Sequence, residues 1–226
     1  MKKFVIFLNL LLICPFVSIS CVNEKGGYEN GHEYVDLGLS VKWATCNIGA
    51  DSAWNGGSYF AWGEVESRQW GDTKMDKYSV EYEFLTKYCT VAKYGYNGLV
   101  DDKIILDAED DAATINWGGR WRTPTEFEIQ ELIDNCVWSW TKENGVYGYR
   151  IRSLISGYSD CSIFLPAAGF MEKGTLYGVK LCGLYWSNSF FTDRPNNVSF
   201  VGFNSDNVDL NGNYRYYGKS IRPVCR

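Results

Sequence analysis

Four acidic residues lie close together in the sequence LDAEDDAAT: Asp107, Glu109, Asp110 and Asp111. Carboxylate oxygens are the ligands that calcium prefers, and several of them in one loop can surround the ion. We expect the cluster to form a solvated turn or the start of a helix, with a bound calcium ion at Asp107, Glu109, Asp110 and Asp111 as the alternative. Carboxylates this close in sequence are poorly suited to face each other across a sugar, as a glycosidase requires. We expect no other cofactor.

Few residues of the chain could activate a nucleophile. His32 is the only histidine, and it lies beside a polar, glycine-rich segment, where a surface position is expected. A serine or cysteine nucleophile would therefore have no other histidine as its general base. We expect that the protein is not an enzyme.

The N-terminus has the order of a secretory signal. Two lysines precede an apolar stretch, residues 4–17, and the small residues Ser18 and Ser20 follow it. The stretch is shorter than the roughly 20 apolar residues of a transmembrane helix. We therefore predict a signal peptide over residues 1–20 and export.

Cys21 comes directly after this segment, as in the signals of bacterial lipoproteins, which it resembles. In those signals the cysteine is lipidated, so we expect Cys21 to hold the protein at the membrane. The alternative is plain secretion with Cys21 as an ordinary thiol. Residues 21–31 are polar and glycine-rich, which is typical of a tether. We expect an outer-membrane lipoprotein that faces either the cell surface or the periplasm.

The other cysteines are spaced too widely for a zinc or redox CxxC motif. An even number of cysteines in an exported domain favours disulfides, although six of them allow 15 connectivities. Because the ends of a compact domain often lie together, we predict a bond between Cys46 and Cys225. The six residues are Cys46, Cys89, Cys136, Cys161, Cys182 and Cys225.

One helix is strongly predicted in the segment RWRTPTEFEIQELIDNC. Thr123 can cap it, Pro124 suits its first position, and Glu126 would complete a capping box. The apolar residues that follow recur at helical spacing: Ile129, Leu132, Ile133 and Cys136. We also expect loops over residues 70–116, with one short helix at residues 80–88.

Short aromatic or β-branched runs, separated by turn residues, predict strands before and after this helix. The predicted strand regions are residues 34–45, 56–67, 137–141, 146–153, 162–170, 183–191, 198–203 and 219–225. A chain that is 46% hydrophobic can bury one sizeable core. We therefore predict an α+β domain over residues 32–226.

Several blocks of the chain carry a family likeness: EYVDLGLSVKWATCNIGA, YFAWGE, DAEDDAATINWGGRWRTPTEFEIQEL, SIFLPAAGF, YWSNS and SIRPVC. Together they resemble the Fibrobacter succinogenes major paralogous domain family of exported bacterial proteins, from about His32 to Cys225. RWRTPTEFEIQEL is also similar to the R-L-P-T-E-x-E-W-E segment of formylglycine-generating, sulfatase-modifying enzymes, with Thr123 and Ile129 replacing leucine and tryptophan. The resemblance implies a C-type-lectin-like fold, with two helices beside small antiparallel sheets, adjacent termini and a loop-rich ligand face.

The C-terminal segment, from YWSNS to SIRPVC, also looks like the variable segment of proteins that diversity-generating retroelements rewrite. Adenine-directed mutagenesis of asparagine codons yields chiefly Asn, Ser, Asp, Tyr and Phe, which are crowded here. Such a mixture resembles antibody paratopes, in which tyrosine supplies contact area and small polar residues supply hydrogen bonds. The alternative is that the asparagines form turns between strands. The predicted ligand-binding residues are Asn188, Phe190, Phe191, Asp193, Asn196, Asn197, Asn204, Asn207, Asp209, Asn211, Asn213, Tyr214, Tyr216 and Tyr217.

These features favour a surface protein that binds a protein or glycan ligand. The net charge of -5 and the absence of a basic stripe argue against nucleic acid as a partner. The calcium-dependent sugar motif of lectins is absent, and the late cysteines Cys182 and Cys225 lie outside any copper-binding motif of the sulfatase-modifying type. An envelope glycan hydrolase, an enzyme of that sulfatase-modifying type and a structural adhesin subunit remain the alternatives.

Overall fold

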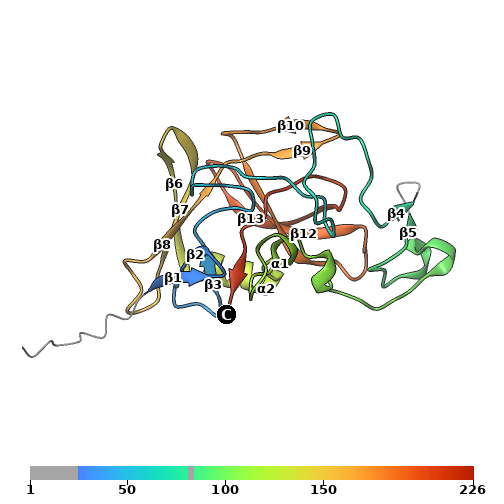
Figure 1. Cartoon of the computed structure of the whole chain (residues 1–226), viewed down its shortest axis with the longest axis horizontal. Coiled ribbons are helices and arrows are strands. Elements are labelled where there is room, and N and C mark those ends of the chain that lie inside the picture. Colours follow the sequence, from blue (N-terminus) through green and yellow to red (C-terminus); the bar gives the residue numbers. More distant parts are fainter. Residues whose placement is uncertain (1–24, 81–83) are drawn as a thin grey trace, which may run out of the picture.

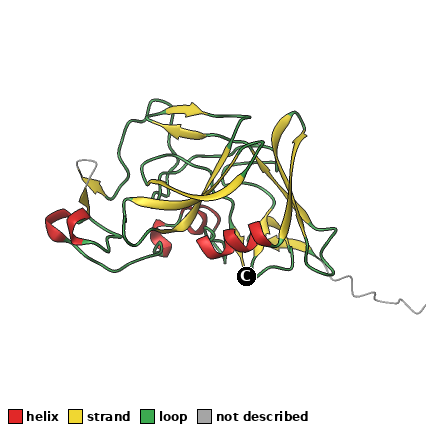
Figure 2. Ribbon diagram, turned by 180° about the vertical axis from the view of Figure 1, so that it is seen from behind, coloured by secondary structure: helices red, strands yellow, loops and turns green. Residues whose placement is uncertain are grey.

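The computed structural model describes residues 25–80 and 84–226. Within these residues the chain forms small antiparallel sheets and two short α-helices, a sheet-rich α+β arrangement (Figure 1). Much of the trace between the sheets is loop (Figure 2). The strands are β1 (Gly26–Glu29), β2 (His32–Val35), β3 (Lys42–Ala44), β4 (Ser79–Val80), β5 (Phe84–Leu85), β6 (Cys136–Glu143), β7 (Val146–Ser153), β8 (Ser162–Pro166), β9 (Phe170–Glu172), β10 (Thr175–Tyr177), β11 (Gly183–Phe190), β12 (Asn197–Phe203), β13 (Val208–Tyr214) and β14 (Val224–Cys225). The helices are α1 (Ala112–Trp117) and α2 (Glu126–Asp134), and three 3-10 turns are Ala92–Tyr94, Tyr96–Gly98 and Ala108–Asp110.

Both ends of the described chain meet in one sheet, with strand order β1-β2-β3-β14 (Figure 1). The tether predicted over residues 21–31 is therefore too long, because residues from Gly26 onward are already paired with β2. Asn30 and Gly31, both at positive φ, form the tight turn between these strands, as Asn-Gly sequences favour. Residues 1–24, which include Cys21 and the predicted signal, lie outside the described residues.

The predicted helix is present as α2, but its cap was placed two residues too early. Thr125 accepts the backbone N–H of Glu128, and the Glu128 carboxylate accepts the N–H of Thr125 at 2.8 Å, so these two residues form the capping box. Thr123 instead donates its hydroxyl to Asp111. Leu132 and Ile129 are buried against the core.

The prediction of a short helix at residues 80–88 is wrong. β4 and β5 pair as a small antiparallel ladder there, and residues 81–83 lie outside the described residues. The remaining residues of 70–116 are mainly loop, as predicted, with short 3-10 turns and α1.

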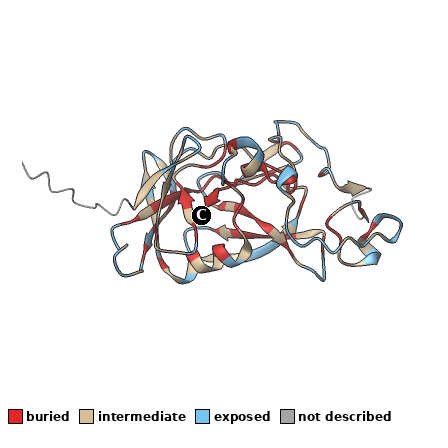
Figure 3. Ribbon diagram, turned by 60° about the horizontal axis from the view of Figure 1, so that its bottom comes forward, coloured by how far each residue is buried: buried red, intermediate tan, exposed pale blue. Residues whose placement is uncertain are grey.

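Two three-stranded sheets, β6-β7-β8 and β11-β12-β13, form the centre of the domain. Buried residues run through the middle of the molecule (Figure 3), and they include most of β8, β11 and β12. Tyr149 of β7 and Phe203 of β12 meet edge to face at 5.3 Å between ring centroids, within one hydrophobic cluster that also contains Ile129 of α2. This cluster joins both sheets to the helix.

β13 was not predicted as a strand. All seven of its residues pair with β12, from Val208 opposite Phe203 to Tyr214 opposite Asn197. Val208 and Leu210 pack against the core, whereas Asp209 and Asn211 are exposed. Apolar and polar residues therefore alternate as in a strand, but only two apolar residues carry the alternation. Conversely, only residues 224–225 of the predicted 219–225 strand belong to a named strand.

The predicted bond between Cys46 and Cys225 is absent, because all six cysteines of the described residues are free. The two ends of the domain do lie together, as expected, because β14 pairs with β3. The register of this pairing decides which residues face each other. Cys225 pairs with Lys42, whereas Cys46 lies beyond the end of β3. No helix within the described part of the chain is long and apolar enough to cross a bilayer.

Candidate ligand-binding face

Five aromatic rings from two separate segments form a continuous row, which we call the tyrosine face. Tyr214 stacks on Tyr216 at 5.4 Å between ring centroids, and Tyr216 lies 4.8 Å from Tyr217. Tyr217 contacts Phe170 at 5.9 Å, and Phe170 stacks on Tyr177 at 5.8 Å. Tyr214 and Tyr177 at the two ends are 43% and 48% exposed, so the row offers aromatic surface to a ligand.

The β9-β10 hairpin and the segment after β13 hold these rings together. Phe170 and Tyr177 are register partners in the hairpin. The backbone groups of Met171 and Gly218 bond to each other in both directions, at 2.7 and 2.8 Å. A Cβ on Gly218 would meet the Cβ of Met171 at 3.0 Å, so a glycine permits this close docking.

A small hollow lies beside Tyr216 and has a cationic lining. Arg68, Lys74 and Lys173 contribute to it, together with Asp72. Arg68 itself is buried and held by Glu64 at 2.9 Å and by the carbonyls of Lys74 and Met75. Burial raises the pKa of both Tyr216 and Tyr217, so their hydroxyls stay protonated at neutral pH. The face therefore combines neutral aromatic rings with the exposed lysines Lys74 and Lys173, whereas the charge of Arg68 is offset by Glu64 and Asp72.

Two buried basic side chains pack beneath the tyrosine face. Arg215 donates to the carbonyls of Lys87, Tyr88 and Pro195, and its guanidinium lies 4.9 Å from the ring of Trp62. These bonds fix the chain between Tyr214 and Tyr216 and leave neighbouring tyrosine side chains at the surface.

Lys219 is the second of these basic side chains and is fully buried. Its Nζ has no hydrogen-bond partner among the described residues and lies 3.7 Å from the ring centroid of Trp186, 4.6 Å from Phe200 and 5.0 Å from Tyr217. Burial lowers its pKa well below the usual value, and the amine rests in an aromatic cage.

The structure brings some of the predicted ligand residues together and separates others. Asn188 and Phe190 are buried, which corrects their assignment as ligand residues: Phe190 packs edge to face on Trp62 at 5.8 Å, inside the core. The remaining predicted residues are exposed or half-buried, namely Phe191, Asp193, Asn196, Asn197, Asn204, Asn207, Asp209, Asn211, Asn213, Tyr214, Tyr216 and Tyr217.

These accessible residues lie along β13 and beyond both of its ends. Asn204 accepts the backbone N–H groups of Asp206 and Asn207, so its side chain builds the β12-β13 turn. Tyr214 ends the strand on the opposite side. The two groups therefore do not form a single compact site.

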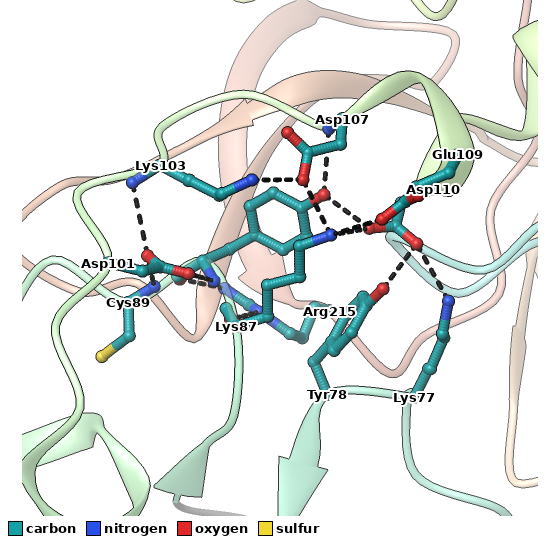
Figure 4. A network of polar contacts seen from close by, with 11 residues as sticks. Lys77, Tyr78, Lys87, Cys89, Asp101, Lys103, Asp107, Glu109, Asp110 and Arg215 are labelled. Carbon is teal, nitrogen blue, oxygen red and sulfur yellow. Dashed lines mark hydrogen bonds and ion pairs between the residues drawn. The ribbon is translucent and has the colours of Figure 1, made fainter.

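The acidic cluster is already occupied by a lysine (Figure 4). Asp107, Glu109 and Asp110 have ligand atoms within 4.8 Å of one another. The Nζ of Lys87 lies between them, at 2.7, 3.2 and 2.6 Å respectively. A calcium ion at this cluster would have to displace that ammonium group.

The surrounding groups explain why Asp110 stays charged although its side chain is buried. Burial alone would raise its pKa, but hydrogen bonds from Lys87, Tyr78, Tyr88 and Lys77 lower the pKa overall. The network fastens Lys77, Tyr78, Lys87 and Tyr88 to the turn before α1, which is a structural task.

Asp111 lies apart from this cluster. Its buried carboxylate caps α1 through the N–H of Ala113 and also accepts the N–H and hydroxyl of Thr123. It therefore belongs to a helix start, one of the two alternatives to a calcium site.

Two of the five rings of the tyrosine face and the basic residues beside it were not predicted from the sequence. Phe170, Tyr177, Arg68 and Lys173 come from segments that carry no ligand signature of their own. The sequence FMEKGTLY has the glycine turn of a hairpin, but nothing in it says that this hairpin docks beside Tyr217. No family model matches the chain, and neither a curated protein nor a solved structure matches it.

Proposed function

We propose that this chain is an exported, lipid-anchored binding protein of the bacterial envelope, whose tyrosine face recognises a protein or glycan ligand. The observation that carries the proposal is the continuous row of five rings, exposed at both ends and flanked by the buried Arg68 and the exposed Lys74. Tyrosine supplies rigid contact area with a polar tip, and such rings are frequent at binding hot spots.

A C-type-lectin-like domain is the fold that we propose for this binding protein. Two short helices beside small antiparallel sheets support it, as does the pairing of β3 with β14 at the two ends of the domain. We further propose that lipidated Cys21 holds the domain at the membrane.

The binding function is tested with two variants at the exposed ends of the row, Tyr214→Ala and Tyr177→Ala. The full chain is applied to an array of polysaccharides and purified envelope proteins, and the dissociation constant for each bound probe is measured. We expect each variant to weaken binding at least tenfold, about 1.4 kcal/mol. Tyr28→Ala is the matched control, because Tyr28 is 73% exposed on β1, in another sheet from the hairpin that carries Tyr177. Unchanged affinity in both test variants would contradict the proposal.

The outward side chains of β13 favour a role as a retroelement target. Asp209 and Asn211 are exposed, while Val208 and Leu210 hold the strand on the core, so the outer positions can vary without loss of packing. The test is the flanking DNA: it should contain a reverse-transcriptase gene and a near-copy of the segment for residues 186–220 that differs mainly at adenines. Its absence removes this proposal and leaves the binding function intact.

A further inference from the structure

Three hollows lie along one loop, residues 64–77, and neighbouring hollows have lining residues in common. The first, of about 560 Å³, and the second, of about 420 Å³, share Val65, Glu66, Ser67 and Gln69. The second shares Asp72 and Lys74 with the small hollow beside Tyr216. The three adjoining hollows, which we call the groove, therefore lead from His32 of β2 to the tyrosine face.

This loop is held in place near its start and in its middle. Gly71 donates its N–H to the carbonyl of Gly174 at 2.9 Å, which fastens the loop to the β9-β10 hairpin. Asn116 of α1 donates its amide to the carbonyl of Val65 at 2.9 Å. The groove is thus a preformed feature, as binding sites usually are.

The first hollow has a flat aromatic wall. His32 stacks on Trp117 with 3.8 Å between ring centroids and 5° between ring planes. Burial lowers the pKa of His32, so its ring is neutral at pH 7. A neutral flat ring can pack against the C–H face of a sugar.

Hydroxyl, amide and carboxylate groups converge on the same hollow. Ser58, Glu66, Gln69 and Asn116 line it beside the aromatic pair. Apolar walls with a few polar groups that fix orientation are typical of small-molecule sites. Sugar hydroxyls can both donate to and accept from groups of these types.

The second hollow carries charges of both signs. Glu64, Glu66 and Asp72 face Lys74 and Lys77 across it. Burial raises the pKa of Glu64 to about 7, although the nearby Arg68 opposes this shift. A highly charged ligand of either sign would meet repulsion there, whereas a neutral chain would not.

We propose that the two larger hollows of the groove bind a linear, neutral oligosaccharide, which stacks on His32 at one end and extends past Gln69 to Lys74 at the other; the hollow beside Tyr216, of about 20 Å³, is too small for a sugar. This inference rests on the proposed binding function and names its ligand class. An extended peptide would be expected to pair with the edge of a sheet, but residues 64–77 contain no strand in the described chain. The mixed charge of the groove likewise disfavours nucleic acid.

The test is calorimetric titration of the full chain with cellohexaose, xylohexaose and chitohexaose, and with the disaccharide of each series. We expect at least one hexasaccharide to bind, and at least tenfold more tightly than its disaccharide, because only the longer chain spans the adjoining hollows. His32→Ala and Gln69→Ala should each weaken binding at least fivefold. Their matched controls, Tyr28→Ala and Gln130→Ala, change an exposed ring on β1 and an amide on α2 and should stay within twofold.

Three results would overturn the groove inference: no binding to any hexasaccharide, equal affinity for disaccharide and hexasaccharide, or undiminished binding in both groove variants. Gln69 is exposed, so its variant remains informative if His32→Ala fails to fold. If Tyr214→Ala and Tyr177→Ala lose a ligand that the groove variants keep, the groove inference fails and the tyrosine face stands. If none of the four variants alters binding to any probe, both fail.

Discussion

Strand β13 and the segment that follows it, residues 215–222, both contain many polar residues but differ in burial. In β13, Asp209, Asn211 and Tyr214 are exposed. In the following segment, the basic residues Arg215, Lys219 and Arg222 are each no more than 1% exposed. Polar residue types alone therefore do not tell a displayed segment from a buried one.

The difference comes from the neighbours of each segment. β13 is the edge of its sheet and pairs only with β12 among the described strands. Residues 215–222 instead thread between loops from the N-terminal half: Lys219 exchanges backbone hydrogen bonds with Phe60, and Ile48 donates to the carbonyl of Ile221. A guanidinium buried there can satisfy its donors with backbone carbonyls, and this makes its burial tolerable.

The largest expected effect is at Arg222. Its guanidinium donates to Asn47 Oδ1 at 2.8 Å and to the carbonyls of Ala44, Thr45 and Phe164. Arg222→Met would leave these acceptors unsatisfied, and we expect a loss of about 3 to 5 kcal/mol in the free energy of unfolding, measured in urea. Arg152→Met, at an exposed position on β7, is the control and should change it by less than about 0.5 kcal/mol. A loss below about 1 kcal/mol at Arg222 would contradict the contrast between the two segments.

Lys219→Met should act in the opposite direction. The Nζ of Lys219 has no hydrogen-bond partner among the described residues, so methionine removes an unsatisfied polar group and keeps the volume of the side chain. We expect a gain of about 1 to 3 kcal/mol in the free energy of unfolding. A destabilised variant would show that the aromatic cage requires the amine.

The same residue predicts a pH dependence. Because the pKa of Lys219 is lowered in the folded state, the unfolded chain binds more protons at pH values between the folded pKa and the usual 10.5. The free energy of unfolding should therefore gain up to about 1.4 kcal/mol per pH unit in that window from this group. Chemical denaturation at pH 7, 8, 9 and 10 should show this slope as a difference between the original chain and Lys219→Met. Parallel pH profiles of the two proteins would contradict a lowered pKa of Lys219 in the folded state.

The smallest expected effect is on β13. Asn211→Ala and Asp209→Ala remove exposed side chains, so each should change the free energy of unfolding by less than about 0.5 kcal/mol. Thermal melts of both variants would check this. A loss above about 1 kcal/mol would mean that the outer residues of β13 are structural, and it would weaken the retroelement proposal too.

Local patterns in the sequence were sufficient for most of the elements. The aromatic and β-branched runs of residues 146–153 and 198–203 became β7 and β12 almost to the residue, because side-chain shape and alternation act locally. The capping box of α2 was displaced by two residues, since Thr123 and Thr125 are both acceptable caps. Only the buried Asp111, which binds Thr123, decides between them.

The sequence by itself determined the α+β class, the helix at α2 and the aromatic, asparagine-rich character of the C-terminal segment. The tertiary structure decided which of those residues are exposed. Phe190 points into the core and Tyr214 to solvent, although both lie among similar neighbours in the chain. It also set Phe170 beside Tyr217 and Lys87 among the three carboxylates. The physical reason is that burial, cation pairing and ring contacts join residues far apart in sequence, whereas propensity and periodicity concern only near neighbours.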